Sequence, residues 1–179
     1  AANLFTHGYA MHGSALVVNN YLNTSWLWER VRVQGGAYGG FARFDVRSGV
    51  FTYLSYRDPN LVGTLNVYDR TADHLREHDI SDDEVRKCII GVIGDLDAHE
   101  LPDARGYSAA TRFLLGTTDD VRQKMRDEIL STTAADFRRF ADALDAVRAH
   151  GRVAVFGSAK AIEAANAELA QKLTVTKVL

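Results

Sequence analysis

Apolar residues recur at helical spacing along most of this chain, and a single stretch alternates as a β-hairpin does. Residues 14–22 and 26–33 form two strongly apolar segments. Residues 23–25, Asn-Thr-Ser, lie between them and are typical of a helix cap, because a Ser or Thr oxygen can accept bonds from the free amides of a first turn. We therefore predict two helices, with Trp26 and Trp28 as core anchors.

The alternating stretch follows directly. Residues 38–46 and 50–56 flank a turn at 47–49, Arg-Ser-Gly, which predicts a hairpin. The return strand is apolar or aromatic at nearly every position, as expected of an inner strand that is covered on both faces.

A glycine-rich joint connects the second helix to the hairpin. Four glycines fall within six residues: Gly35, Gly36, Gly39 and Gly40. Glycine adds backbone entropy to the unfolded chain and offers no side chain for packing, so we expect a close approach to the backbone here. The run has neither the G-x-G-x-x-G order nor a following helix, which argues against a nucleotide site. Arg32 and Tyr38 are the polar side chains best placed beside the joint.

The remaining pattern is mainly helical. Asp58-Pro59 starts a helix that ends near residue 78, and Ser81 with Glu84 predicts a capping box for the next one. Further predicted elements are helices at 85–98, 107–115, 118–130, 133–150 and 159–169, a break at 101–106 and a buried strand at 152–157. This order favours an α+β domain in which several helices cover an antiparallel sheet. With so few strands, we expect residues 1–179 to be a single domain whose sheet is truncated at its N-terminal side.

The composition of the chain limits the kinds of partner that it is expected to bind. The chain has 179 residues and is 46% hydrophobic, enough for one sizeable core. A formal net charge of -2, with acids and bases interspersed, gives no field that would attract nucleic acid or an anionic membrane. No apolar run approaches the roughly 20 residues that span a bilayer. We therefore expect neither nucleic acid nor membrane as a partner.

Cys88 is the only cysteine, so an intrachain disulfide is impossible and a reducing compartment fits well. Its neighbours Val85, Ile89 and Val92 form an apolar helical stripe. We therefore interpret Cys88 as a buried structural residue, since no activating base is identifiable.

Residues 74–78, His-Leu-Arg-Glu-His, match the inverted zinc motif H-x-x-E-H. On a helix, His74 and His78 share a face and could hold a metal while Glu77 activates its water. The motif lies at a helix end in a charged segment that we expect to be exposed, where the helix dipole favours histidine without a metal. No third ligand is apparent. We therefore reject this candidate metal site.

Arg32 and Tyr38 could both donate hydrogen bonds to a carbonyl oxygen, as oxyanion-stabilising groups do. Their spacing alone favours a plain structural pair.

A family resemblance favours a functional role for Arg32 and Tyr38 instead. The string W-L-W-E-R-V-R-V-Q-G-G-A-Y-G-G-F over residues 26–41 is highly specific, and residues 54–61 and 101–107 add to it. Over essentially its whole length the chain resembles the last domain of the presequence proteases, organellar peptidasomes of the pitrilysin/insulinase superfamily.

The resemblance implies a zinc metalloendopeptidase of four related α+β domains, whose two halves close around a chamber. It implies degradation of unfolded peptides, such as cleaved targeting presequences, in the mitochondrial matrix or plastid stroma. The zinc and its ligands would lie in the N-terminal catalytic half, outside this chain, so the chain alone would be inactive. Arg32 and Tyr38 would contact the substrate carbonyl, supported by a loop of Gly35, Gly36 and Gly39.

Two other functions stay open from the residues. One is a non-catalytic scaffold or interaction domain that keeps the fold. The other is a small zinc hydrolase that uses His74, Glu77 and His78. The position of this motif at a helix end and the lack of an apparent third ligand argue against it.

Overall fold

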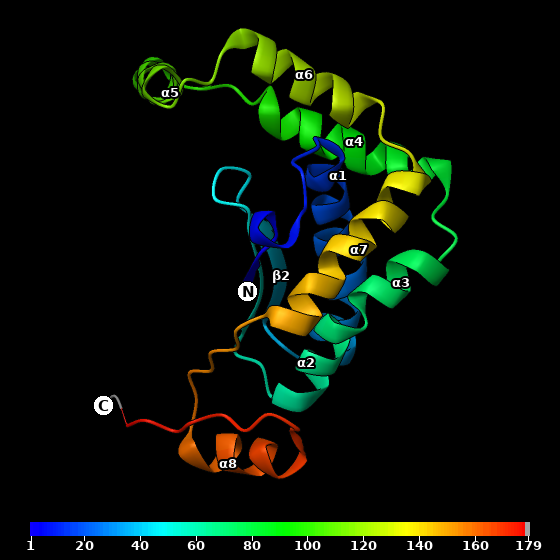
Figure 1. The fold of residues 1–179 in the computed structure, drawn as a ribbon, viewed down its shortest axis with the longest axis vertical. Coiled ribbons are helices and arrows are strands. Elements are labelled where there is room, and N and C mark those ends of the chain that lie inside the picture. Colours follow the sequence, from blue (N-terminus) through cyan, green and yellow to red (C-terminus); the bar gives the residue numbers. More distant parts are fainter. Residues whose placement is uncertain (178–179) are drawn as a thin grey trace.

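The computed structural model describes residues 1–177. One long helical run lies near the start of the chain (Figure 1). Helix α1 (Ser14–Tyr21) continues into two π-helical segments, η2 (Leu22–Trp26) and η3 (Trp28–Gln34). The predicted interruption at residues 23–25 is therefore wrong. A π-helical stretch keeps the chain helical while it shifts which residues face the core.

Side chains at the expected cap explain the difference. Thr24 does not cap a helix, because its hydroxyl donates to the Asn20 carbonyl 2.9 Å away, as within a continuous helix. The Asn23 amide donates to the Ala42 carbonyl at 2.9 Å and its oxygen accepts from the Ala42 N–H at 2.6 Å. These polar residues therefore fasten the helix to the sheet.

The sheet has three antiparallel strands: β1 (Ala2–Asn3), β2 (Gly39–Phe44) and β3 (Val50–Tyr56). The order β1-β3-β2 makes β3 the inner strand, and the predicted hairpin is confirmed. β1 was not predicted, since two residues carry no periodic signal. The expectation that β3 is covered on both faces is wrong, because its second half, including Leu54 and Tyr56, is exposed.

Seven further helices follow in the described part of the chain: α2 (Leu61–Asp69), α3 (Thr71–Glu77), α4 (Asp82–Leu96), α5 (Pro102–Leu114), α6 (Asp119–Leu130), α7 (Ala134–His150) and α8 (Ala159–Glu168). The single helix predicted before residue 78 is two helices that meet at Arg70. The break predicted at 101–106 is also wrong, because Pro102 opens α5 as the first-turn proline. The capping box of Ser81 and Glu84 is confirmed.

Residues 152–157 do not form the predicted buried strand. The segment is largely exposed, with Phe156 in solvent, and within residues 1–177 its backbone pairs only with the first residue. The Arg152 N–H donates to the Ala1 carbonyl at 2.8 Å, and the Ala1 amino group donates back at 2.9 Å. A short apolar run does not by itself distinguish a strand from an exposed connection.

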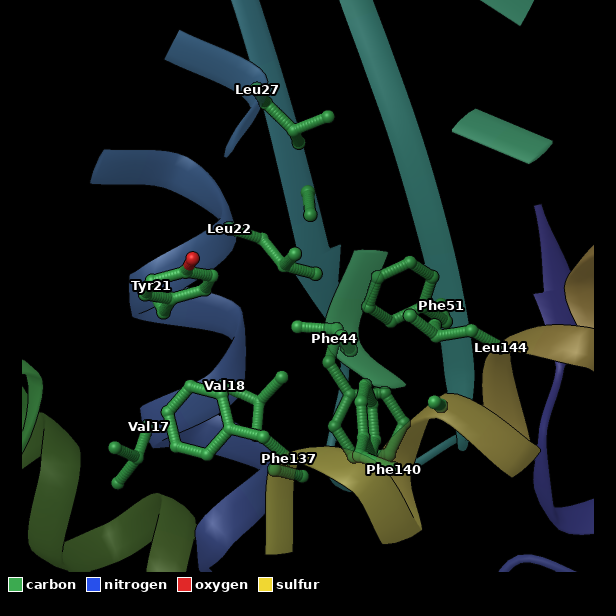
Figure 2. Packing of buried hydrophobic residues seen from close by; sticks show 14 of the residues in the cluster. Val17, Val18, Tyr21, Leu22, Leu27, Phe44, Phe51, Phe137, Phe140 and Leu144 are labelled. Carbon is green, nitrogen blue, oxygen red and sulfur yellow. The ribbon is translucent and has the colours of Figure 1, made fainter. Parts of the chain in front are cut away.

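The core lies between the inner face of the sheet and helices α1 and α7 (Figure 2). Phe140 of α7 meets Phe44 and Phe51 of the hairpin at ring-centroid distances of 6.1 and 5.9 Å. Tyr21 of α1 packs edge-on against Phe137 at 5.4 Å. Helices cover one face of a small antiparallel sheet, so the predicted α+β class is confirmed.

Cys88 is buried on α4, and burial raises the pKa of its thiol to about 11, in keeping with the structural role predicted for it. Among the described residues, no helix is both long and apolar enough to cross a lipid bilayer.

Candidate functional site

The joint between η3 and β2 fixes the backbone on either side of Arg32 and Tyr38. The Gly36 N–H donates to the Arg32 carbonyl at 2.9 Å, and the Ala37 N–H donates to the Val31 carbonyl at 3.1 Å. Gly36 has φ +74°, the left-handed conformation that commonly ends a helix. Two residues later, the Tyr38 N–H donates to the Tyr56 carbonyl at 3.0 Å. The joint is therefore ordered, with helix bonds before it and sheet bonds after it.

Two of the other glycines, Gly39 and Gly40, lie where neighbouring side chains approach the backbone closely, as expected. A Cβ at Gly40 would lie 2.7 Å from the Val31 side chain, so only glycine lets β2 pass so close to η3. A Cβ at Gly39 would lie 2.5 Å from the Phe41 ring, which folds over it. The Gly35 carbonyl accepts a bond from the Asn60 side chain, which ties the joint to the start of α2. The glycines therefore serve packing as well as chain reversal.

Arg32 lies in the last turn of η3 and its side chain is exposed. Its guanidinium lies 4.1 Å from the centre of the Trp28 ring, a cation–π contact that holds the long side chain against the helix. Trp28 is itself 46% exposed, so the prediction that it anchors the core is wrong. The stack presents a preorganised cation to solvent.

Tyr38 immediately precedes β2, and 67% of its surface is exposed. Its ring meets Tyr56 edge-on with centroids 5.8 Å apart. The Arg57 guanidinium lies 5.9 Å from the Tyr38 ring and 5.4 Å from the Tyr56 ring. Aromatic and cationic neighbours therefore hold the Tyr38 ring while leaving its surface open to solvent.

Arg57 is a candidate site residue that the sequence analysis missed. It has φ +47°, the only positive φ outside glycine in the described part of the chain. An arginine in this conformation is strained by about 1 kcal/mol, and such strain gathers at functional sites. Arginine is not favoured at positive φ, so no sequence signal could have found it.

The outward face of the hairpin adjoins this group. Phe41 pairs with Leu54 and Gly39 with Tyr56, so these side chains lie on the face opposite to the buried Ala42 and Phe44. Phe41, Leu54 and Tyr56 are all exposed. Tyr38, through its contact with Tyr56, therefore adjoins a surface that offers apolar contact area, and neither Tyr38 nor Arg32 is sealed inside the protein.

The rejected zinc motif has a packing role. The imidazole of His74 stacks on Trp26 with centroids 4.1 Å apart, and its Nε2 lies 3.1 Å from the Tyr21 hydroxyl. Burial, with the nearby His78 and Arg30, lowers the pKa of His74 to about 4. The expectation that the segment is exposed is thus wrong for His74, although Glu77 and His78 are exposed.

This geometry does not suit a metal ion. The ring nitrogen of His74 faces Tyr21, and the His78 imidazole stacks against His74 at 4.9 Å with its Nε2 3.9 Å from the Glu84 carboxylate. Within residues 1–177, no three His, Cys, Asp or Glu side chains gather as a metal site would require.

Comparison with known proteins decides the family. The model of the PreP C-terminal domain matches residues 1–160. This chain belongs to that family. Over its full length it is 52% identical to presequence protease 1, chloroplastic/mitochondrial, of Arabidopsis thaliana, of which it covers 17%. The mitochondrial presequence protease of Emericella nidulans is 33% identical over 76% of this chain and 13% of that protein. Protein HypA of Clostridium perfringens is 32% identical over 90% of this chain and 16% of that protein.

Membership of the PreP C-terminal domain family therefore concerns a part of much longer relatives. The chain spans about a sixth of their length. The Arg32–Tyr38 joint lies within the matched residues.

Proposed function

We propose that this chain is the substrate-contacting C-terminal domain of a zinc metalloendopeptidase that degrades unfolded peptides, such as cleaved targeting presequences. Its family membership and its identity to presequence proteases support this assignment. The chloroplastic and mitochondrial names of these relatives support a mitochondrial or plastid location. Its partners are then the catalytic half of the same polypeptide and the unfolded peptide.

The zinc belongs to the catalytic half. There it would act as a Lewis acid and activate the attacking water. The described residues of this chain offer no ligand set for it, so we expect the isolated chain to have no hydrolytic activity.

Tyr38 has the role of a hydrogen-bond donor to the substrate carbonyl. Its phenol can donate to an oxygen that gains negative charge as water attacks the peptide carbon. The Tyr38 ring is held by Tyr56 and Arg57, and its N–H is engaged in the sheet. Because the ring is already placed, little reorganisation is needed when the charge develops.

Arg32 supplies fixed positive charge at the same joint. Its guanidinium rests on Trp28, and its backbone carbonyl is held by the Gly36 N–H. A planar guanidinium can donate to a carbonyl oxygen, and it can bind a carboxylate with two parallel bonds. The exposure of both side chains on one ordered joint is the structural observation that best supports the proposal.

The outward face of the hairpin supports an unfolded substrate. Phe41, Leu54 and Tyr56 give an exposed apolar surface beside the joint. Such a surface can bind many side chains without strict sequence preference, provided the peptide is not folded.

The test compares two neighbouring tyrosines in the intact polypeptide. Tyr38→Phe should lower kcat by about 100-fold, or about 3 kcal/mol, with a small change in KM, because the lost bond forms mainly in the transition state. Tyr56→Phe is the matched control, because it removes only a hydroxyl from the adjacent ring and keeps the apolar surface that this ring offers to a peptide. It should leave kcat within about 2-fold. Arg32→Ala should reduce kcat/KM at least as strongly as Tyr38→Phe.

Wild-type turnover of Tyr38→Phe would contradict the proposed role of this residue. An intact polypeptide without any peptidase activity when zinc is supplied would contradict the enzyme and favour the scaffold.

A further inference from the structure

Helix α5 stands apart from the rest of the fold (Figure 1). It spans Pro102–Leu114, and none of its residues is buried. Tyr107 is 77% exposed, Phe113 85% and Leu114 81%. Large apolar side chains at such exposure cost free energy unless another surface covers them.

The apolar residues of α5 gather on one side. At 100° per residue, Tyr107, Ala110 and Leu114 fall within a narrow arc and Phe113 borders it; we call these four residues the α5 stripe. Arg105 and Arg112, seven residues apart, lie on the opposite side. The helix is therefore amphipathic, although the described fold provides nothing for its apolar side to pack against.

Helix propensity does not account for the order of α5. An isolated helix of about 12–15 residues is marginal in water, and most helices in proteins are stabilised by packing of their apolar side. Apart from the backbone bonds of the helix, the Ser108 hydroxyl donates to the Glu100 carboxylate at 2.8 Å. This bond links α5 to the residues just before it and not to the core.

We propose that the α5 stripe is a docking surface for another part of the same polypeptide. This inference rests on the proposal that the chain is one domain of a longer peptidase. More than four fifths of the length of the relatives lies outside the matched part, so a covering surface is available within one molecule. A tethered surface has a high effective concentration, which lets a small apolar contact persist.

A second copy of this chain fits the stripe less well. A 13-residue helix is about 20 Å long, and one side of it offers on the order of 300 Å². Two such sides bury roughly 600 Å² in total, whereas stable interfaces between separate chains bury about 1,200 Å² or more. The stripe is therefore too small to hold a dimer but large enough for contact within one polypeptide.

Amide hydrogen exchange of residues 102–115 tests the inference. In the chain alone these amides should exchange within about 10-fold of unstructured rates, because α5 has no buried residue. In the intact polypeptide they should exchange at least 10-fold more slowly than in the chain alone. Equal rates in the two proteins would overturn the inference.

Paired substitutions in the intact polypeptide identify the side that docks. Replacing Phe113 and Leu114 together by Ala should remove the added protection, whereas Arg112→Ala should keep it. Alanine favours helix at all three positions, so a selective loss reports lost docking rather than lost propensity. Equal effects would overturn the assignment of the docking side.

Other occupants give different results. Protection of the chain alone that rises with its own concentration would overturn the inference in favour of a second copy. Protection that requires added phospholipid vesicles would overturn it in favour of a membrane surface. The turnover of Tyr38→Phe is a separate readout. Loss of turnover in this variant, with no protection of α5 in the intact polypeptide, would refute the docking alone. Protection of α5 in a polypeptide that has no peptidase activity would refute the proposed function alone.

Discussion

Trp26 and Trp28 are two residues apart on one helical run, and they have opposite environments. The Trp26 ring stacks on His74, and its indole N–H donates to the Thr71 hydroxyl at 3.0 Å. Trp28 faces solvent beneath the Arg32 guanidinium. A two-residue step along a helical run turns it by roughly half a circle, so the same residue type supports the core on one side and the candidate site on the other.

Two groups of aromatic residues elsewhere in the fold repeat this contrast between buried and exposed contacts. The inner group contains Phe44, Phe51 and Phe140, whose contacts are buried. The outer group contains Tyr38 and Tyr56, whose contacts are exposed and bordered by arginine. Burial makes the inner contacts a source of stability, whereas the outer ones are left available for a ligand.

The largest expected effect on stability comes from the inner group. Phe51→Ala should lower the free energy of unfolding by about 3–5 kcal/mol, because Phe51 is fully buried and its loss leaves a cavity. Tyr56→Ala, on the same strand but exposed, should cost less than about 1 kcal/mol. Urea denaturation of both variants would check this, and similar costs for the two would break the contrast between the groups.

A pH dependence should arise from His74, which packs between Trp26 and Tyr21. Its pKa is about 4 in the folded protein and ordinarily 6.5, because burial disfavours the charged ring. Between these two pKa values the unfolded chain binds more protons than the folded chain does. The free energy of unfolding should therefore fall as the pH drops from about 6.5 to about 4, and the contribution of His74 should be fully present above pH 6.5.

After discounting for partial exposure, the expected loss is about 1–2 kcal/mol. Unfolding measured at pH 7 and pH 4.5 should show this loss in the wild type and a smaller one in His74→Gln. The same pH dependence in both proteins would show that other groups cause it.

Sequence reasoning worked where a local signal decided the structure. The Ser81 and Glu84 capping box set the start of α4, and the Arg-Ser-Gly turn set the hairpin. The substrate contacts assigned to Arg32 and Tyr38 stay a prediction; the structure leaves both side chains exposed beside the glycine-rich joint.

Sequence reasoning failed where distant contacts overrode local preference. Asn23 looked like a cap residue, yet it bonds Ala42, nineteen residues away in sequence. Residues 152–157 are as apolar as a buried strand, but only Ala1 pairs with them in the described structure. The side of the helix that each tryptophan faces depends on the π-helical segments, which no local signal predicts.

Arg57, which borders the outer group, has a strained backbone that glycine should suit better than alanine. Arg57→Gly should raise the free energy of unfolding by about 1 kcal/mol relative to Arg57→Ala, because only glycine relieves the positive φ. Both variants lack the guanidinium, so their difference isolates the backbone strain. Equal stability by thermal denaturation would show that Arg57 is not strained.

The smallest expected effect on stability is that of Tyr38→Phe. The Tyr38 ring remains beside Tyr56 and only an exposed hydroxyl is lost, so the free energy of unfolding should change by less than about 0.5 kcal/mol. A larger loss by urea denaturation would assign Tyr38 a structural role.

The most direct test of the proposed role of the joint is differential binding by the intact polypeptide. A peptide with a phosphinate in place of the scissile bond mimics the tetrahedral oxyanion, whereas the same peptide with a reduced bond lacks the oxygen. Tyr38→Phe should weaken binding of the phosphinate by about 100-fold and binding of the reduced peptide by less than about 3-fold, because Tyr38 bonds the developing oxyanion. Equal loss for the two peptides, or none, would contradict that role.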